Sequence, residues 1–261
     1  MLHKKSLGQN FLKSESAISA IIDASDIVPS DIVLEIGPGE GVLTQYLTKL
    51  AGKVIAIEKD HRLIPFLTEK FAKEISTGKL DVLEKDILEF DPGVLSFYKL
   101  PYKVIANIPY YITGQILRMF LETKNQPKSM TLMVQKEVAD RILARDNKES
   151  LLSLSVKAFG TPKYIKTVKA GSFVPAPNVD SAILLIEDIS KGRLGGVDEA
   201  VFFQTIHAGF AHKRKQLLPN LSSLYKKENI LTAFEKLGIS TKIRAEDLPL
   251  ETWVSFCSII K

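Results

Sequence analysis

Short apolar runs alternate with amphipathic helical patterns between residues 31 and 135 of the chain. Five of the apolar runs have the length of buried strands: DIVLEIG (31–37), KVIAIEKD (53–60), LDVLEKD (80–86), YKVIANIP (102–109) and SMTLMVQ (129–135). Helical patterns lie between most of them, at 41–51, 61–75 and 112–122. Strands joined by helical crossovers form a parallel sheet that helices cover on both faces. The alternation therefore predicts an α/β fold.

The chain beyond this region predicts the end of the sheet and then a change of fold class. After a helical pattern at 136–144 come three apolar or alternating runs that we expect to extend or finish the sheet: 151–160, 164–171 and 181–189. Residues 188–197 mix charge with three glycines, as linkers do. Four helical patterns follow: 198–211, 213–225, 227–238 and 249–260. We therefore expect one domain over residues 1–190 and a small helical domain over 191–261.

Basic residues gather near both ends of the chain, which has a net charge of +5. Lys4 and Lys5 lie in a basic N-terminal arm, and residues 191–261 hold 11 Lys and Arg against 7 Asp and Glu. Two basic regions suit a polyanionic partner such as nucleic acid. Solubilising surface charge explains the same composition, so composition alone leaves both readings open.

Other compositional features narrow the protein's location and chemistry. Cys257 is the only cysteine, which excludes an intrachain disulfide and predicts a reducing, cytoplasmic compartment. No stretch reaches the roughly eighteen apolar residues of a membrane span. The four histidines lack the spacing of metal ligands. We therefore expect no membrane association and no metal site.

A glycine-rich turn connects the first predicted strand to its helix. VLEIGPGEGVLT (33–44) contains Gly37, Gly39 and Gly41, and glycines let a ligand approach the main chain. An ordinary strand-to-helix turn is the alternative. The third glycine comes one residue too early for a dinucleotide-binding G-x-G-x-x-G pattern, which would need glycine or alanine at Val42. The turn is therefore a candidate ligand loop, but not a dinucleotide loop.

Acidic residues end the next two strands, at the edge of the sheet where the glycine turn also lies. Glu58 ends KVIAIE, and Asp86 ends LDVLEKD. A carboxylate at the first position accepts hydrogen bonds from ribose hydroxyls, and one at the second is placed for an adenine amino group. The glycine turn, Glu58 and Asp86 occur together without a phosphate-binding group. This combination favours S-adenosylmethionine as cofactor over a dinucleotide.

The segment NIPYY (107–111) follows the strand at 102–106 and has the groups that an amino-methylating site needs. The Asn107 side-chain oxygen and the Ile108 carbonyl would accept the two hydrogens of an adenine amino group and so direct its lone pair toward the methyl donor. Pro109 stiffens the turn, and Tyr110 or Tyr111 would stack on an extruded base. A capped strand end with buried tyrosines is the alternative.

Motifs along nearly the whole chain resemble those of the ribosomal RNA adenine N6,N6-dimethyltransferases. They occur in the family's order: KKSLGQNFL (4–12), EIGPGEGVLT (35–44), NIPYY, MVQKEVADRI (133–142), FVPAPNVDSAI (173–183), FAHKRKQL (210–217) and RAEDL (244–248). The similarity is greatest to the small-subunit, KsgA-type branch. It implies a Rossmann-like class I S-adenosylmethionine-dependent methyltransferase domain followed by a small all-helical domain that binds rRNA.

The resemblance also implies roles for individual residues. The predicted cofactor-binding residues are Gln9, Asn10, Leu12, Gly37, Gly39, Glu58, Lys59, Asp86, Ile87 and Asn107. The predicted catalytic residues are Asn107, Ile108, Pro109, Tyr110 and Phe173, the last as a second aromatic that closes on the target base. The predicted RNA-binding residues are Lys4, Lys5, Lys213, Arg214 and Lys215.

The activity that the resemblance implies is dimethylation of two adjacent adenosines near the 3′ end of small-subunit rRNA. The expected substrate is a pre-ribosomal small subunit, and the expected enzyme is a monomer. Two alternatives stay open at this point. One is methylation of a large-subunit adenine, as in the macrolide-resistance enzymes, and the other is a non-catalytic RNA- or DNA-binding assembly or transcription factor.

Overall fold

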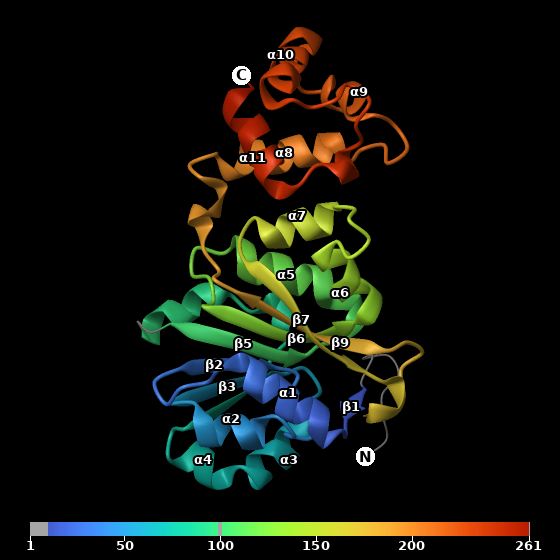
Figure 1. The fold of residues 1–261 in the computed structure, drawn as a ribbon. Helices are drawn as coiled ribbons and strands as arrows, with labels where there is room; N and C mark the ends of the chain where they lie inside the picture. The colour runs from blue at the N-terminus through green and yellow to red at the C-terminus, as the bar shows by residue number, and fades with distance from the viewer. Residues whose placement is uncertain (1–9, 99–100, 261) are drawn as a thin grey trace. The chain divides into compact units, whose positions relative to one another are not determined.

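The computed structural model describes residues 10–98 and 101–260 (Figure 1). The strands are β1 (Phe11–Leu12), β2 (Ile32–Ile36), β3 (Lys53–Glu58), β4 (Leu80–Glu84), β5 (Tyr102–Asn107), β6 (Ser129–Gln135), β7 (Thr161–Val168), β8 (Phe173–Val174) and β9 (Ser181–Glu187). The helices are α1 (Glu15–Ser25), α2 (Thr44–Leu50), α3 (Leu63–Lys70), α4 (Ala72–Ser76), α5 (Thr113–Glu122), α6 (Lys136–Leu143), α7 (Leu151–Lys157), α8 (Glu199–Gly209), α9 (Leu217–Leu221), α10 (Lys227–Leu237) and α11 (Leu250–Ile259). Among the described residues, no helix is long and apolar enough to cross a membrane.

Seven of the strands form one sheet in the order β4-β3-β2-β5-β6-β9-β7. The five strands predicted from the alternating pattern, β2 to β6, pair in parallel as expected. The direction of the later runs was not predicted, and β9 pairs with β6 in the antiparallel direction. A loop rather than a helix leads into β9, and antiparallel pairing requires no helical crossover. The sheet is therefore mixed.

Helices cover the sheet on both faces, with α1 and α2 on one side and α5 on the other (Figure 1). The central strands β2 and β5 are buried except at Asn107, the last residue of β5, and Val33, Leu34, Val104 and Ile105 are all 0% exposed. Burial on both faces explains why these strands are continuous apolar runs rather than alternating ones. It also leaves the carboxyl ends of the strands as the place where polar side chains can reach a ligand.

A buried lysine holds the amino-terminal edge of the sheet to the end of α1. The Lys103 ammonium lies 2.8 Å from the Asp31 carboxylate, and both side chains are about 5% exposed or less. It also donates hydrogen bonds to the main-chain oxygens of Ser25, at 3.1 Å, and Asp26. These carbonyls lie at the carboxyl end of α1, where a cation is favoured. The contacts fix the first helix against β2 and β5.

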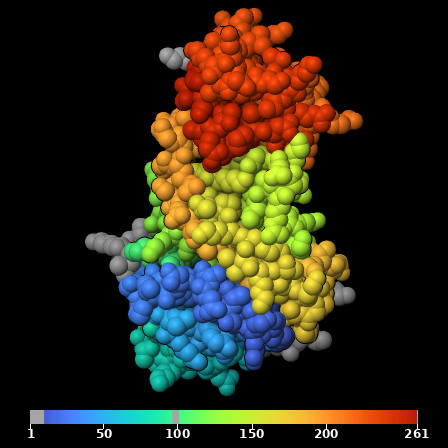
Figure 2. Space-filling model, in the orientation of Figure 1, coloured from blue at the N-terminus to red at the C-terminus, as the bar shows by residue number. Residues whose placement is uncertain are grey.

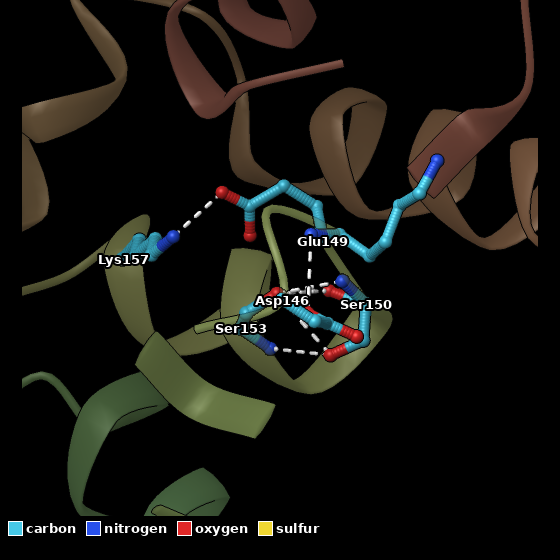
Figure 3. Close-up of polar contacts among 6 residues, drawn as sticks. Asp146, Glu149, Ser150, Ser153 and Lys157 are labelled. Atoms are coloured by element: carbon cyan, nitrogen blue, oxygen red, sulfur yellow. Dashed lines mark hydrogen bonds and ion pairs between the residues drawn. The ribbon is translucent and has the colours of Figure 1, made fainter. Parts of the chain in front are cut away.

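The run at 151–160, which we expected to belong to the sheet, forms helix α7 instead. Figure 3 shows the reason. The Ser150 hydroxyl accepts a hydrogen bond from the Ser153 N–H at 3.1 Å, and the Ser150 N–H donates to the Ser153 hydroxyl at 2.6 Å. This is a capping box, which starts a helix. The Lys157 ammonium, at the end of α7, pairs with Glu149, which precedes the helix, at 2.6 Å.

The chain divides into two compact units. The first contains residues up to Ala139 and Pro162–Ile189, and the second contains Asp140–Thr161 and the chain from Ser190 onward. Helix α7 thus belongs to the same unit as the C-terminal helices, where Phe159 stacks on Phe203 with ring centroids 5.8 Å apart. The assignment of separate functions to residues 1–190 and 191–261 stays a prediction.

Helices α8 to α11 pack around buried aromatic side chains, including Phe202, Trp253 and Phe256, each 0% exposed. The pattern at 213–225 gives a helix only from Leu217, because residues 211–216 form bends and a turn. Pro219 falls in the first turn of α9, where a missing N–H is tolerated. Gly238 ends α10 in the left-handed conformation.

Candidate active site

The carboxyl ends of β2, β3 and β5 open onto one cavity. All the predicted cofactor-binding residues that the structure describes line it: Asn10, Leu12, Gly37, Gly39, Glu58, Lys59, Asp86, Ile87 and Asn107. Gln9 lies outside the described residues. Ile108, Pro109 and Tyr110 line the same cavity. Segments far apart in the sequence therefore meet at the point where the strand ends predict a ligand.

The glycine turn is held against β3 by a direct hydrogen bond. The Gly39 N–H donates to the Glu58 carboxylate at 3.1 Å, and Gly39 has a φ of 60°, which side chains rarely adopt. A Cβ at Gly39 would also lie 3.0 Å from the Phe11 ring. Gly41 differs, because a Cβ there would lie 2.4 Å from the Phe71 ring, away from the cavity lining. Gly39 thus lines the cavity, whereas Gly41 leaves room for the Phe71 ring.

The Glu58 side chain is almost fully buried, and its carboxylate form can only accept hydrogen bonds. It is 6% exposed, and its second oxygen accepts a hydrogen bond from the Asp60 N–H at 2.8 Å. Burial raises the pKa of the Glu58 carboxyl, although the N–H groups of Asp60 and Gly39 oppose the rise. Each oxygen retains a lone pair, so the carboxylate can still accept hydrogen bonds from a ligand with two hydroxyls.

Asp86, which lines the same cavity, is fixed by two contacts. One oxygen accepts a hydrogen bond from the Leu88 N–H at 3.0 Å, and the other pairs with the Lys59 ammonium at 2.5 Å. Burial raises the pKa of Asp86, but the bonds from Lys59 and Leu88 outweigh it, so the pKa lies below its usual value. The Asp86 carboxylate is therefore ionised and held in a fixed orientation in which it can accept hydrogen bonds.

A strap formed by Asn10–Lys13 crosses from the cavity to the chain around Phe173. The Asn10 carbonyl accepts a hydrogen bond from the Asn107 side-chain nitrogen at 3.0 Å. Strand β1 pairs with β8, and the Lys13 ammonium meets Glu40 of the glycine turn at 2.6 Å. Because the nitrogen of the Asn107 amide is engaged by the strap, its Oδ1 is the acceptor that the side chain offers to a ligand.

Hydrogen bonds to two of its carbonyls hold the backbone of the turn after β5. The Pro109 carbonyl accepts the Ile112 N–H at 3.2 Å, and the Tyr110 carbonyl accepts the Thr113 hydroxyl at 3.1 Å. The Ile108 carbonyl accepts no hydrogen bond from the residues that the structure describes. Asn107 Oδ1 and the Ile108 oxygen are thus two acceptors on consecutive residues.

The aromatic residues near this turn have different environments. The Tyr110 hydroxyl lies 2.6 Å from that of Ser181, which fixes the ring, and burial raises the pKa of the phenol. Tyr111 lines the cavity but is 66% exposed. Phe173 does not line the cavity, because β8 places its side chain in the hydrophobic core at 2% exposure. Its role as a second aromatic that closes on the target base stays a prediction.

Sequence reasoning missed Glu35, a buried acid inside β2 that lines the cavity. Its side chain is almost fully buried, at 1% exposure, and accepts a hydrogen bond from the Thr44 hydroxyl at 2.7 Å. Burial raises the pKa of Glu35 to about 8, and the negative charge of Glu58 adds to the rise. The sequence did contain a signal for this residue, since Glu35 is the one charged residue in the otherwise apolar strand IVLEI.

The predicted RNA-binding lysines and arginine fall in different parts of the chain. Lys4 and Lys5 lie outside the described residues. Lys213, Arg214 and Lys215 are exposed and belong to the turn His212–Lys215 between α8 and α9, which we call the basic turn. In Figure 2, orange-red side chains of this part of the chain project at the right-hand edge. No cluster of metal-ligating side chains occurs in the described ranges.

Sequence comparison finds similar proteins with consistent names. A protein from Dehalococcoides mccartyi, "Ribosomal RNA small subunit methyltransferase A", is 42% identical over 258 residues, which cover 98% of this chain and 88% of the relative. A protein of the same name from Clostridium botulinum is 40% identical, with 95% of this chain and 90% of the relative covered.

Solved structures show the same fold. A dimethyladenosine transferase from Plasmodium falciparum matches with a TM-score of 0.82 and 27% identity, covering 94% of this chain and 95% of that one. The 23S rRNA methyltransferase ErmE matches with a TM-score of 0.78 and 24% identity, covering 96% and 99%. These matches confirm the predicted methyltransferase fold with a helical C-terminal part.

The family comparison covers the chain from end to end. The model of the family described as "Ribosomal RNA adenine dimethylase" matches residues 1–261. This match agrees with the order of motifs in the sequence, and with the cavity that unites the glycine turn, the two acids and the NIPYY turn. The chain belongs to the ribosomal RNA adenine dimethylase family.

Proposed function

We propose that this chain transfers methyl groups from S-adenosylmethionine to the N6 amino groups of two adjacent adenosines near the 3′ end of small-subunit rRNA. The observation that carries the proposal is the pair of acceptors, Asn107 Oδ1 and the Ile108 carbonyl, beside a cavity with the acids of a nucleoside site. The small-subunit names of the relatives that are about 40% identical support the choice of RNA.

The described residues fit S-adenosylmethionine by their donor and acceptor chemistry. Glu58 is a buried carboxylate next to the glycine turn and suits the ribose hydroxyls. Asp86, held by the Leu88 N–H and by Lys59, suits the adenine amino group. Asn10 and Leu12, on the strap, would face the methionine end. When bound, the cofactor supplies an electrophilic methyl group.

The chain's own contribution to the reaction is alignment. Asn107 Oδ1 and the Ile108 oxygen accept the two hydrogens of the adenine amino group, which directs its lone pair toward the methyl group. The Asn10 carbonyl in the strap accepts a hydrogen bond from the Asn107 side-chain nitrogen, which leaves the side-chain oxygen for the substrate. The fixed ring of Tyr110 offers a face on which the target base stacks.

The RNA-binding role belongs to the basic turn, with Lys4 and Lys5 of the N-terminal arm as a second contact. Lys213, Arg214 and Lys215 are exposed side chains suited to phosphate groups. Phosphate contacts supply affinity, and RNA shape supplies target choice. We further propose that the protein acts as a monomer on a pre-ribosomal small subunit in the cytoplasm.

The test is direct. The purified protein is incubated with S-adenosylmethionine and undermethylated small or large ribosomal subunits, and dimethyladenosine is located in each rRNA by mass spectrometry. We expect product in the small subunit alone. Asn107→Ala should lower the rate by about a hundredfold or more, because it removes a preorganised acceptor.

Other outcomes would change the assignment. Product in the large subunit alone would place the protein with the 23S enzymes. Tight rRNA binding without product from either subunit would make it a binding factor. Tyr111→Phe, a change at an exposed cavity residue that keeps the ring, serves as the control for Asn107→Ala and should retain the activity.

A further inference from the structure

Behind the basic turn lies a buried asparagine. Asn220, in α9, is 4% exposed, and its side-chain nitrogen donates to the Gly209 carbonyl at 2.6 Å and to the His212 carbonyl at 3.3 Å. Gly209 is the last residue of α8, and His212 is the first residue of the basic turn. One amide group thus joins the end of a helix to the start of the turn.

The His212 carbonyl has two donors, and together they determine the geometry of the turn. It accepts the Lys215 N–H at 3.0 Å, which closes the turn, and it accepts the Asn220 amide from inside the unit. Lys213 and Arg214 occupy the two central positions, where side chains point outward from a turn. Asn220 therefore acts on the segment that carries the positive charge without contributing charge.

The surroundings of Asn220 indicate that its amide has a specific role. Its Oδ1 is buried and has no hydrogen-bond partner among the described residues, which is unfavourable. The neighbouring Gly209 packs so tightly that a Cβ there would lie 2.4 Å from the Trp253 ring. A leucine would fill a similar volume without an unpaired oxygen, so the donors of the amide are what distinguish asparagine at this position.

We propose that Asn220 is a positioning residue for RNA binding: its amide holds the basic turn in the shape in which Lys213, Arg214 and Lys215 reach rRNA phosphates. This inference rests on the proposed function of the basic turn. It assigns Asn220 no contact with RNA, cofactor or target base.

The test compares the full-length protein with Asn220→Leu and with Thr205→Val. Thr205 is a matched control because it is 0% exposed in the same unit, and its hydroxyl bonds to the Val201 carbonyl at 2.7 Å and the Tyr225 hydroxyl at 2.6 Å. The probe is a transcript of the 3′-terminal part of small-subunit rRNA, and its Kd is measured over a range of salt concentrations. Unfolding temperature and the Kd for S-adenosylmethionine are measured alongside.

We expect Asn220→Leu to weaken RNA binding by about tenfold. The plot of log K against log salt should become less steep by about one or two units, because phosphate contacts are lost. Thr205→Val should lower the unfolding temperature without changing this slope. Neither variant should change the Kd for S-adenosylmethionine by more than about twofold. Equal effects of the two variants on the slope would overturn the inference.

The triple variant Lys213→Glu, Arg214→Glu, Lys215→Glu separates this inference from the proposed function. If Asn220 acts through the turn, Asn220→Leu in the triple background should cause no further loss of RNA affinity. A full additional tenfold loss there would show that Asn220 acts elsewhere and refute the inference. If the triple variant itself binds RNA normally, the RNA-binding role of the turn fails, whatever Asn220 does.

Discussion

Replacing Glu35 with glutamine should stabilise the protein at mildly alkaline pH. The usual pKa of this carboxyl is 4.5, and burial raises it to about 8. Below pH 4.5 both the folded and the unfolded chain hold the proton. Between pH 4.5 and 8 the unfolded chain releases it while the folded chain retains it, so the free energy of unfolding falls as the pH rises. Above pH 8 both states are ionised and the loss is complete.

The size of this effect follows from the difference between the two pKa values. From 4.5 to about 8 is about 3.5 units, and one unit corresponds to about 1.4 kcal/mol. The full penalty is therefore on the order of 5 kcal/mol, of which about 4 kcal/mol falls between pH 5 and pH 8. Glutamine can still accept the Thr44 hydroxyl, and it does not titrate. The glutamine NH2 group has two N–H donors. An N–H that is left unpaired in this buried position offsets about 1–3 kcal/mol of the gain in stability.

The assay is thermal unfolding of wild type and Glu35→Gln from pH 5 to pH 9, without cofactor. Taking the difference between the two curves cancels the other titrating groups. We expect it to favour the variant increasingly with pH and to level off near pH 8. Thr44→Val removes a hydrogen bond that lowers the pKa of Glu35, so its stability should continue to fall above pH 8. A flat difference between pH 5 and pH 8 would mean that Glu35 is ionised in the folded protein, and would refute the reasoning.

Two further predictions concern the cofactor and the sheet. Because burial raises the pKa of Glu58, the affinity of the wild type for S-adenosylmethionine should fall on acidification at a pH above the usual range of glutamate, since only the carboxylate offers both oxygens as acceptors to the ribose. Calorimetric titration of Glu58→Gln should give weaker binding without this dependence, and a pH dependence that persists in the variant would assign it to another group. Lys103→Met, which leaves a buried carboxylate without its partner, should cost about 3–5 kcal/mol in urea unfolding. Lys53→Met, which breaks a more exposed pair, should cost about 0–1 kcal/mol, and equal losses would contradict the assigned role of burial.

The sequence predicted the parallel part of the sheet because strands buried on both faces are continuous apolar runs. It did not predict the direction of β9, since a run such as SAILLIE is equally apolar in either direction. The segment at 151–160 was misread because its spacing fits both a strand and a helix. The capping box of Ser150 and Ser153, which is a local signal, decides for the helix.

The candidate site was predictable where its residues follow strands, because the carboxyl ends of parallel strands meet at one edge. Glu58, Asp86 and Asn107 line one cavity for this reason. The orientation of the Asn107 amide was not predictable, since it depends on pairing between β1 and β8, which are more than 150 residues apart in the chain. Asn220 gave no sequence signal at all, because a single asparagine in a helical pattern is ordinary.

The division of the chain into units has a consequence for its synthesis. The second unit is assembled from Asp140–Thr161 and from the chain after Ile189, with strands of the first unit between them. Helix α7 therefore leaves the ribosome before β9, the last strand of the first unit, and before α8 to α11 of its own unit. A fragment that starts at residue 191 lacks Phe159, the stacking partner of Phe203. The C-terminal helices are thus one of the two segments of a discontinuous module, and an isolated module would need a chain that joins both segments.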